Sequence, residues 1–182
     1  FNSMSTREDG AQSPLIESRA DLVAWIAAGE KPKSGWRIGT EHEKFVFRTI
    51  SLEPVPYDGP RGIRALMELL IQRYGWVAIM EGDNIIALKR PEGTLGGNIS
   101  LEPGGQFELS GAPLQTLHET AEETSRHLCE VLDVGEDLAI GFLGIGFSPK
   151  WTLAETPRMP KQRYGVMTRY MPQVGSRGLD MM

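Results

Sequence analysis

Three strand-like segments that follow one another with only turns between them constrain the fold of this chain most. They cover residues 76–80, 84–89 and 98–109, and turn residues at 81–83 and 91–97 separate them. Consecutive strands joined by short turns pair as an antiparallel meander, because parallel strands need a long crossover connection. The predicted fold is therefore α+β, with an antiparallel sheet in place of alternating βαβ units.

Helices are predicted before and after these strands. The clearest covers residues 63–74, where apolar residues recur at the spacing of one helix face and Gly75 follows them. Ser18 and Asp21 resemble a capping box that opens an earlier helix. The other predicted elements are helices over residues 18–29, 114–132 and 162–171, strands over residues 36–49 and 139–147, and a last strand that begins at residue 179.

Charge and cysteine content limit the class of protein. The 182 residues carry a net charge of −5, which argues against non-specific nucleic-acid binding, and no apolar run approaches the ~18–20 residues that cross a bilayer. The single cysteine, Cys129, can form no internal disulfide, which suits a reducing compartment. We therefore expect a cytoplasmic protein without a nucleic-acid or membrane partner. Residues 1–13 are expected to be an extraneous remnant and a disordered tail, and residues 14–182 one domain.

Residues 39–45 read Gly-Thr-Glu-His-Glu-Lys-Phe, inside a predicted strand. Because side chains alternate faces along a strand, Glu41 and Glu43 are expected on the same side as Phe45 and Phe47. Two like charges ~7 Å apart on a half-buried face repel each other unless a cation lies between them. Oxygen ligands suit magnesium or manganese. The alternative is that this end of the strand is solvated and the glutamates have no role.

Residues 100–111 read Ser-Leu-Glu-Pro-Gly-Gly-Gln-Phe-Glu-Leu-Ser-Gly. A proline and two glycines inside a strand-like run indicate a bulge or a close backbone approach. Glu102 and Glu108 would be ~20 Å apart in an extended strand, so they can share a site only if residues 103–105 bend the chain. A plain loop with exposed glutamates is the alternative.

Basic residues dominate the stretch from residue 150 to residue 177, and two tyrosines lie among them. This stretch could be a solvated face, a site that captures a substrate carboxylate or phosphate, or, against the acidic whole, a nucleic-acid site. On the preceding helix, His118 and His127 are expected at the surface, and Cys129 is expected to be a small buried apolar residue and not a nucleophile.

Taken together, residues 39–45, 100–111, 141–147 and 159–182 resemble the plant-type glutamate–cysteine ligases, a family shared with many proteobacteria. The resemblance covers about residues 36–182. It implies a curved antiparallel sheet with outer helices, forming half of a glutamine-synthetase-like catalytic funnel. It also implies that the chain is the N-terminal part of a longer enzyme, inactive by itself because the C-terminal half of the site is missing.

The reaction implied by this resemblance is the ATP-dependent joining of L-glutamate to L-cysteine through γ-glutamyl phosphate, the first step of glutathione biosynthesis. Mg²⁺ or Mn²⁺ is the implied cofactor and ATP the co-substrate. Another carboxylate–amine ligase of the same superfamily, or a non-catalytic binding domain, is the alternative. The resemblance implies metal ligands at Glu41, Glu43, Glu102 and Glu108, a catalytic role for Arg163, and substrate contacts from Arg163, Tyr164, Arg169 and Met181.

Overall fold

Two antiparallel sheets form the centre of the molecule, which a computed structural model describes for residues 15–92 and 96–182. The larger sheet has the strand order β1-β6-β5-β4-β3, and the smaller sheet pairs β2 with β7. This arrangement confirms the predicted α+β class and the antiparallel meander. The larger sheet contains β1 (Glu41–His42), β3 (Val77–Glu81), β4 (Asn84–Lys89), β5 (Asn98–Leu101) and β6 (Phe107–Ser110), and the smaller contains β2 (Phe45–Arg48) and β7 (Ile140–Leu143).

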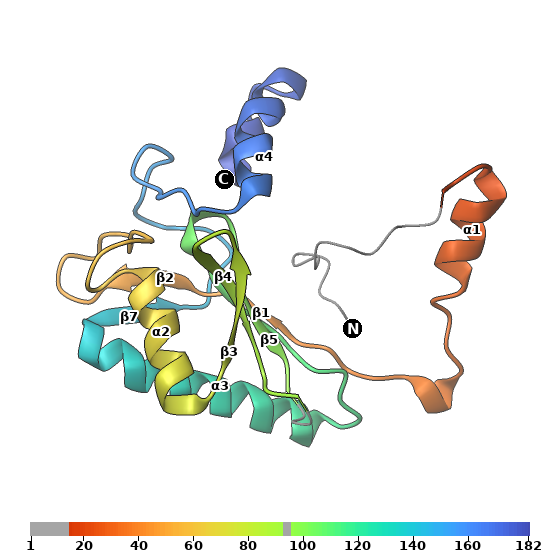
Figure 1. The fold of residues 1–182 in the computed structure, drawn as a ribbon, viewed down its shortest axis with the longest axis horizontal. Helices are drawn as coiled ribbons and strands as arrows, with labels where there is room; N and C mark the ends of the chain where they lie inside the picture. Colours follow the sequence, from red (N-terminus) through yellow and green to blue (C-terminus); the bar gives the residue numbers. More distant parts are fainter. Residues whose placement is uncertain (1–14, 93–95) are drawn as a thin grey trace.

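The helices are distributed unevenly around these sheets (Figure 1). Helices α2 (Ile63–Tyr74) and α3 (Leu117–Leu138) contact each other, and they also contact β4 and β7 respectively. Helix α4 (Gln162–Val174) packs against the short 3-10 helix η3 (Gly178–Met181), and α1 (Arg19–Ala27) stands apart from the sheets (Figure 1). Two further 3-10 turns are η1 (Lys33–Gly35) and η2 (Pro103–Gly105). The predicted tail at residues 1–13 lies outside the described residues.

Helix α2 forms as its sequence pattern predicts. Ile63, Leu66, Met67 and Leu70 are all completely buried, so one face of the helix lies in the main hydrophobic core. Gly75 ends the helix with φ 71°, a left-handed conformation that glycine adopts without a steric penalty. The predicted capping box of α1, formed by Ser18 and Asp21, is also present.

Helix α3 differs from its prediction in length and in its buried face. It begins at Leu117, next to a capping box formed by Thr116 and Glu119, and it continues to Leu138. It passes through Gly135, where the missing side chain makes room for β7; a Cβ there would lie 2.7 Å from the carbonyl oxygen of Ile140. The expectations of a buried Cys129 and a surface His127 were both wrong: Cys129 is exposed and His127 is buried.

Two segments predicted as single strands are each divided in two. Residues 36–49 contribute β1 to the larger sheet and β2 to the smaller one. Residues 98–109 form the hairpin β5–β6, because Pro103–Gly105 turns the chain back with positive φ at Gly104 and Gly105. The strand expected from residue 179 is also wrong, since Gly178–Met181 forms the 3-10 helix η3.

Ala139, which ends α3, is one of two non-glycine residues with positive φ among the described residues, at φ 53° and ψ 45°. An alanine in this left-handed conformation costs about 1 kcal/mol relative to glycine. We therefore expect Ala139→Gly to raise the free energy of unfolding by about 1 kcal/mol in urea denaturation. Ala139→Val, whose branched side chain disfavours positive φ, should lower it. A destabilised glycine variant would contradict this interpretation.

Candidate functional site

The register of the larger sheet places oxygen-bearing side chains together on one face. Residues directly opposite each other on paired strands project to the same face. Ser100 lies opposite Glu108, and Glu41 and Asn98 both lie opposite Ser110. Since side chains alternate along a strand, Glu108 and Ser110 also share a face. We call the face that carries these five residues the polar face of the sheet.

Glu43 and Glu102 extend the polar face. Beyond β1, Lys44 and Phe107 exchange two backbone hydrogen bonds, of 3.2 and 2.8 Å, which carries the register of β1 and β6 onward. This pairing sets Glu43 opposite Glu108. Glu102 follows Ser100 at a spacing of two, and its amide bonds to the carbonyl of Gln106, which preserves the hairpin register. All four glutamates of the two sequence motifs therefore belong to one face.

Glu41 and Glu108 lie close enough on this face for a hydrogen bond between their carboxyl groups. A hydrogen bond between the two side chains is the largest of the effects that raise the pKa of Glu41 to about 7, followed by burial and by the charges of Glu108 and Glu43. Glu108 is 7% exposed and accepts a short hydrogen bond from the Ser100 hydroxyl. Burial raises the pKa of Glu43, and so do the charges of Glu108 and Glu102. The carboxyl groups are thus close enough to resist full ionisation.

Glu102 is held differently from the other three glutamates. Its Oε2 accepts a hydrogen bond of 3.0 Å from the hydroxyl of Tyr164, which also donates to the carbonyl of Leu101 at 2.9 Å. The Lys161 ammonium lies 3.7 Å from its Oε1 and is almost fully buried. These contacts tie the start of α4 to the end of β5. Among the described residues, Lys161 Nζ has no hydrogen-bond partner within normal distance.

Lys44 lies on the opposite side of the sheet from its neighbour Glu43. It is 1% exposed, and its ammonium donates to the carbonyl of His42 at 2.6 Å. Burial lowers the pKa of Lys44 to about 8, against the opposing charges of Glu108 and Glu43. The alternation along residues 41–47 therefore holds, but Lys44 and Val46 are the buried members, while Phe45 and Phe47 are only half-buried.

The residues predicted to contact substrates are mostly exposed. Arg163 and Arg169 are exposed side chains of α4, and Met181 is 64% exposed in η3. Tyr164 is buried, and burial raises its pKa, as does the charge of Glu102. The guanidinium of Arg163 lies 5.4 Å from the centroid of the Tyr164 ring. The structure thus joins Tyr164 to the carboxylates through Glu102, and the substrate-binding roles of all four residues stay predictions.

Sequence reasoning missed two residues that touch this site, Ser100 and Lys161, and it also missed the burial of Lys44 on the other side of the sheet. Ser100 could have been found, because it precedes Glu102 by two positions and so shares its face. Lys161 carried no local signal, since its partner lies 59 positions earlier in the chain. Within residues 15–92 and 96–182, no three His, Cys, Asp or Glu side chains are arranged as they stand to hold a metal ion.

The raised pKa of Glu41 predicts a pH dependence in protein freed of divalent cations. The folded-state pKa of about 7 exceeds the ordinary value of 4.5, so the folded state binds a proton more tightly than the unfolded state does. The resulting stability is present below pH 4.5 and is lost as the pH rises through about 7. Carboxyl ¹³C NMR should show a Glu41 midpoint near 7 that falls in Glu108→Gln. An ordinary midpoint in both proteins would contradict the pairing.

Comparison with known proteins gives consistent matches. The family model described as "Glutamate-cysteine ligase family 2(GCS2)" matches residues 37–182. Glutamate–cysteine ligase A of Oryza sativa subsp. japonica is 53% identical over 175 residues, which are 96% of this chain and 34% of that protein. The Brassica juncea enzyme is 54% identical over 172 residues, 94% of this chain and 32% of that protein. The chain thus spans about a third of the length of these curated relatives.

These relatives also bear on location. The rice, Brassica juncea and Arabidopsis thaliana proteins are all named as chloroplastic. The expectation of a cytoplasmic location conflicts with these names and is therefore wrong as an inference from composition. Cysteine content and net charge do not distinguish the cytoplasm from the chloroplast, because both compartments are reducing. Across the part of the chain that the structure describes, no helix is both long and apolar enough to cross a membrane.

Proposed function

We propose, from the membership of this chain in glutamate–cysteine ligase family 2, that the complete protein joins L-glutamate to L-cysteine at the expense of ATP, the first step of glutathione biosynthesis. A γ-carboxylate oxygen of glutamate attacks the γ-phosphorus of ATP, and the bond to the β-phosphate oxygen breaks to release ADP. The cysteine amine then attacks the acyl carbon of γ-glutamyl phosphate, loses a proton and displaces phosphate. The rest of the complete protein would supply the C-terminal half of the site.

Glu41, Glu43 and Glu108 are the residues that would hold Mg²⁺ or Mn²⁺. The support is the crowding of carboxyl groups on the polar face, which raises the pKa of Glu41 and of Glu43. Oxygen-only donors suit these hard cations. When bound, the cation supplies charge neutralisation for the phosphoryl group that is transferred. Glu102 is a less direct candidate, because its Oε2 accepts a hydrogen bond from Tyr164 and the Lys161 ammonium lies 3.7 Å from its Oε1.

The polar face also supports the proposed architecture. Helices α2 and α3 pack on the side of the sheet that carries Leu101 and Phe107, which leaves the carboxylates on the other side. A sheet with helices on one side and acidic side chains on the other is what half of a glutamine-synthetase-like funnel would require. In this arrangement Arg163 and Arg169 would meet the carboxylates of the amino-acid substrates, since guanidinium groups bind carboxylates through paired hydrogen bonds. Tyr164 and Met181 would also contact the amino-acid substrates there.

The test is ADP release by the full-length protein with Mg²⁺, ATP and L-glutamate, in the presence and absence of L-cysteine. We expect release that requires both amino acids, together with formation of the γ-glutamyl dipeptide. A panel of other amines separates the cysteine ligase from a carboxylate–amine ligase with a different acceptor. Absence of ADP release with every acceptor would contradict the proposal and favour a non-catalytic binding domain.

A further inference from the structure

Ser100 is a buried hydroxyl group on the polar face. It is 1% exposed, and a hydroxyl at that depth must find its hydrogen-bond partner within the protein. Its cross-strand neighbours are Ala87 on β4, whose methyl group accepts no hydrogen bond, and Glu108 on β6. The hydroxyl donates to Oε2 of Glu108 at 2.5 Å, so its single proton is committed to that carboxylate.

This bond restricts the orientation of the Glu108 carboxylate. A glutamate side chain turns about three bonds, and the last of these torsions is broad, so a place on a strand does not by itself fix the two oxygens. Glu108 is 7% exposed and is held at Oε2, with its carboxyl group within hydrogen-bond reach of Glu41. Because the bond to Ser100 uses Oε2, Oε1 is left for a cation.

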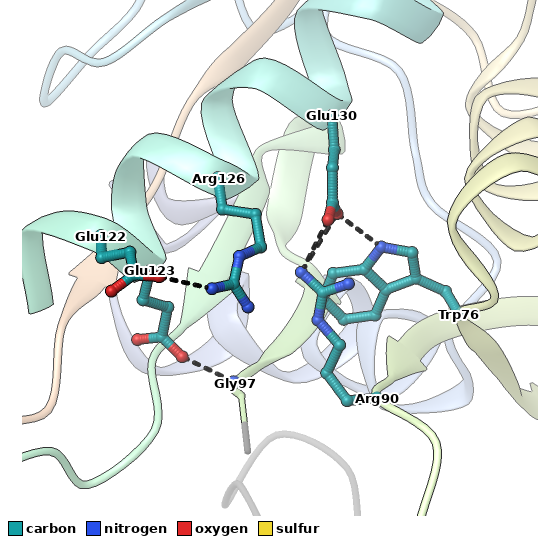
Figure 2. A network of polar contacts seen from close by, with 7 residues as sticks. All are labelled: Trp76, Arg90, Gly97, Glu122, Glu123, Arg126 and Glu130. Atoms are coloured by element: carbon teal, nitrogen blue, oxygen red, sulfur yellow. Dashed lines mark hydrogen bonds and ion pairs between the residues drawn. The ribbon is translucent and has the colours of Figure 1, made fainter. Parts of the chain in front are cut away.

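The β5–β6 hairpin that carries this pair is held at both ends. At one end Pro103–Gly105 closes the turn. At the other end, the Glu123 carboxylate accepts from the amide of Gly97, which precedes β5, at 2.7 Å and from the amide of Ala112, which lies beyond β6, at 3.0 Å. Figure 2 shows the Glu123 side chain reaching from α3 to Gly97. The backbone thus keeps the serine and the glutamate opposite each other.

Such a hydroxyl can affect cation binding in two opposite ways. If it only competed with the cation for Oε2, its removal would strengthen binding. If it fixes the carboxylate, its removal weakens binding, because the cation must then order a side chain that was ordered before. The enclosed position of Ser100 and the fixed hairpin favour the second effect, since the bond leaves the other oxygen of Glu108 available.

We propose that Ser100 is a positioning residue for the cation site: its hydroxyl holds the Glu108 carboxylate facing Glu41 and Glu43 before the cation binds. This inference rests on the proposed function, because it gives Ser100 a role only if these carboxylates hold Mg²⁺ or Mn²⁺. A preformed site favours Mg²⁺, which demands near-ideal octahedral geometry, over Ca²⁺, which accepts a flexible set of oxygens.

The test is titration of metal-free full-length protein with Mn²⁺, followed through the electron paramagnetic resonance signal of the free ion, and then displacement of the bound Mn²⁺ by Mg²⁺ or Ca²⁺. In Ser100→Ala we expect the affinities for Mn²⁺ and Mg²⁺ to fall about tenfold, as is typical when a metal ligand loses the group that orients it. The affinity for Ca²⁺ should fall by about twofold or less. Ser100→Cys, close in size but a weaker donor, should show a smaller loss in the same order.

Ser51→Ala serves as the control for these variants. Ser51 also donates to a glutamate, Glu53, at 3.0 Å, but in the exposed turn after β2, and its substitution should change none of the three affinities. Unchanged or tighter Mn²⁺ binding in Ser100→Ala, or equal losses for Mg²⁺ and Ca²⁺, would overturn the positioning role and leave the cation site standing. Absence of saturable Mn²⁺ binding by the parent protein would overturn the cation site as well.

Discussion

Replacing Glu108 by glutamine in the full-length protein should lower turnover about a thousandfold, or ~4 kcal/mol, while leaving the fold intact. Glu108 faces Glu41 and Glu43 on the polar face, so its removal withdraws the central carboxylate from the proposed cation site. The free energy of unfolding should be unchanged or slightly higher, because a glutamine amide can donate to Glu41 and its oxygen can still accept from Ser100. ADP release and urea denaturation measure the two quantities.

Glu68→Gln is the matched control for this experiment. Glu68 is an exposed glutamate of α2, on the opposite side of the sheet from the polar face. Its substitution should change neither turnover nor stability by a measurable amount. Equal turnover in Glu108→Gln and Glu68→Gln would mean that the polar face takes no part in catalysis.

Phe107→Ala should have the contrasting effect, although Phe107 is the neighbour of Glu108. Its side chain is completely buried, and its ring centroid lies 6.2 Å from that of Phe142, which joins the larger sheet to the smaller one. Removing a buried phenylalanine ring costs about 3–5 kcal/mol, through lost apolar burial and the cavity that remains. We expect the free energy of unfolding to fall by this amount in urea denaturation.

Phe147→Ala provides the comparison, because Phe147 is 75% exposed. It should change the free energy of unfolding by less than about 0.5 kcal/mol. Similar losses in the two variants would mean that Phe107 does not occupy the core position assigned to it.

Local patterns predicted the elements whose causes are local. The period of apolar residues in α2 fixed its buried face, and Gly75 fixed its end. The meander followed from turn residues between consecutive strands, and β4 was predicted with its observed bounds. Alternation along strands also predicted that Glu41 and Glu43 share a face. In each case the deciding interaction joins residues close in sequence.

The errors arose where distant parts of the chain decide the outcome. Gly135 reads as the end of a helix, but β7 packs on it and α3 continues. Lys44 is buried although lysine favours the surface. It lies where the chain passes from the larger sheet to the smaller one, and there it pairs with the backbone of the buried Phe107. Tertiary packing therefore overrode the local preference at both positions.

The candidate site shows the same division. The two glutamate motifs could be found from the sequence. The sequence also showed that Glu102 and Glu108 can share a site only if the chain bends at Pro103–Gly105, as it does. The contacts of Lys161 and Tyr164 with Glu102 were not predictable, because α4 and β5 lie about 60 residues apart in the chain. These contacts give Glu102 partners that the other three glutamates lack, and residue spacing alone could not predict this difference.

Divalent-cation binding tests the central claim, that the carboxylates of the polar face form a cation site. Metal-free full-length protein is titrated with Mn²⁺, and the electron paramagnetic resonance signal of the free ion reports binding. Saturable binding should weaken at least about tenfold in Glu43→Gln, or ~1.4 kcal/mol, and remain unchanged in Glu68→Gln. Equal affinity of Mn²⁺ for Glu43→Gln and for the parent protein would contradict the claim.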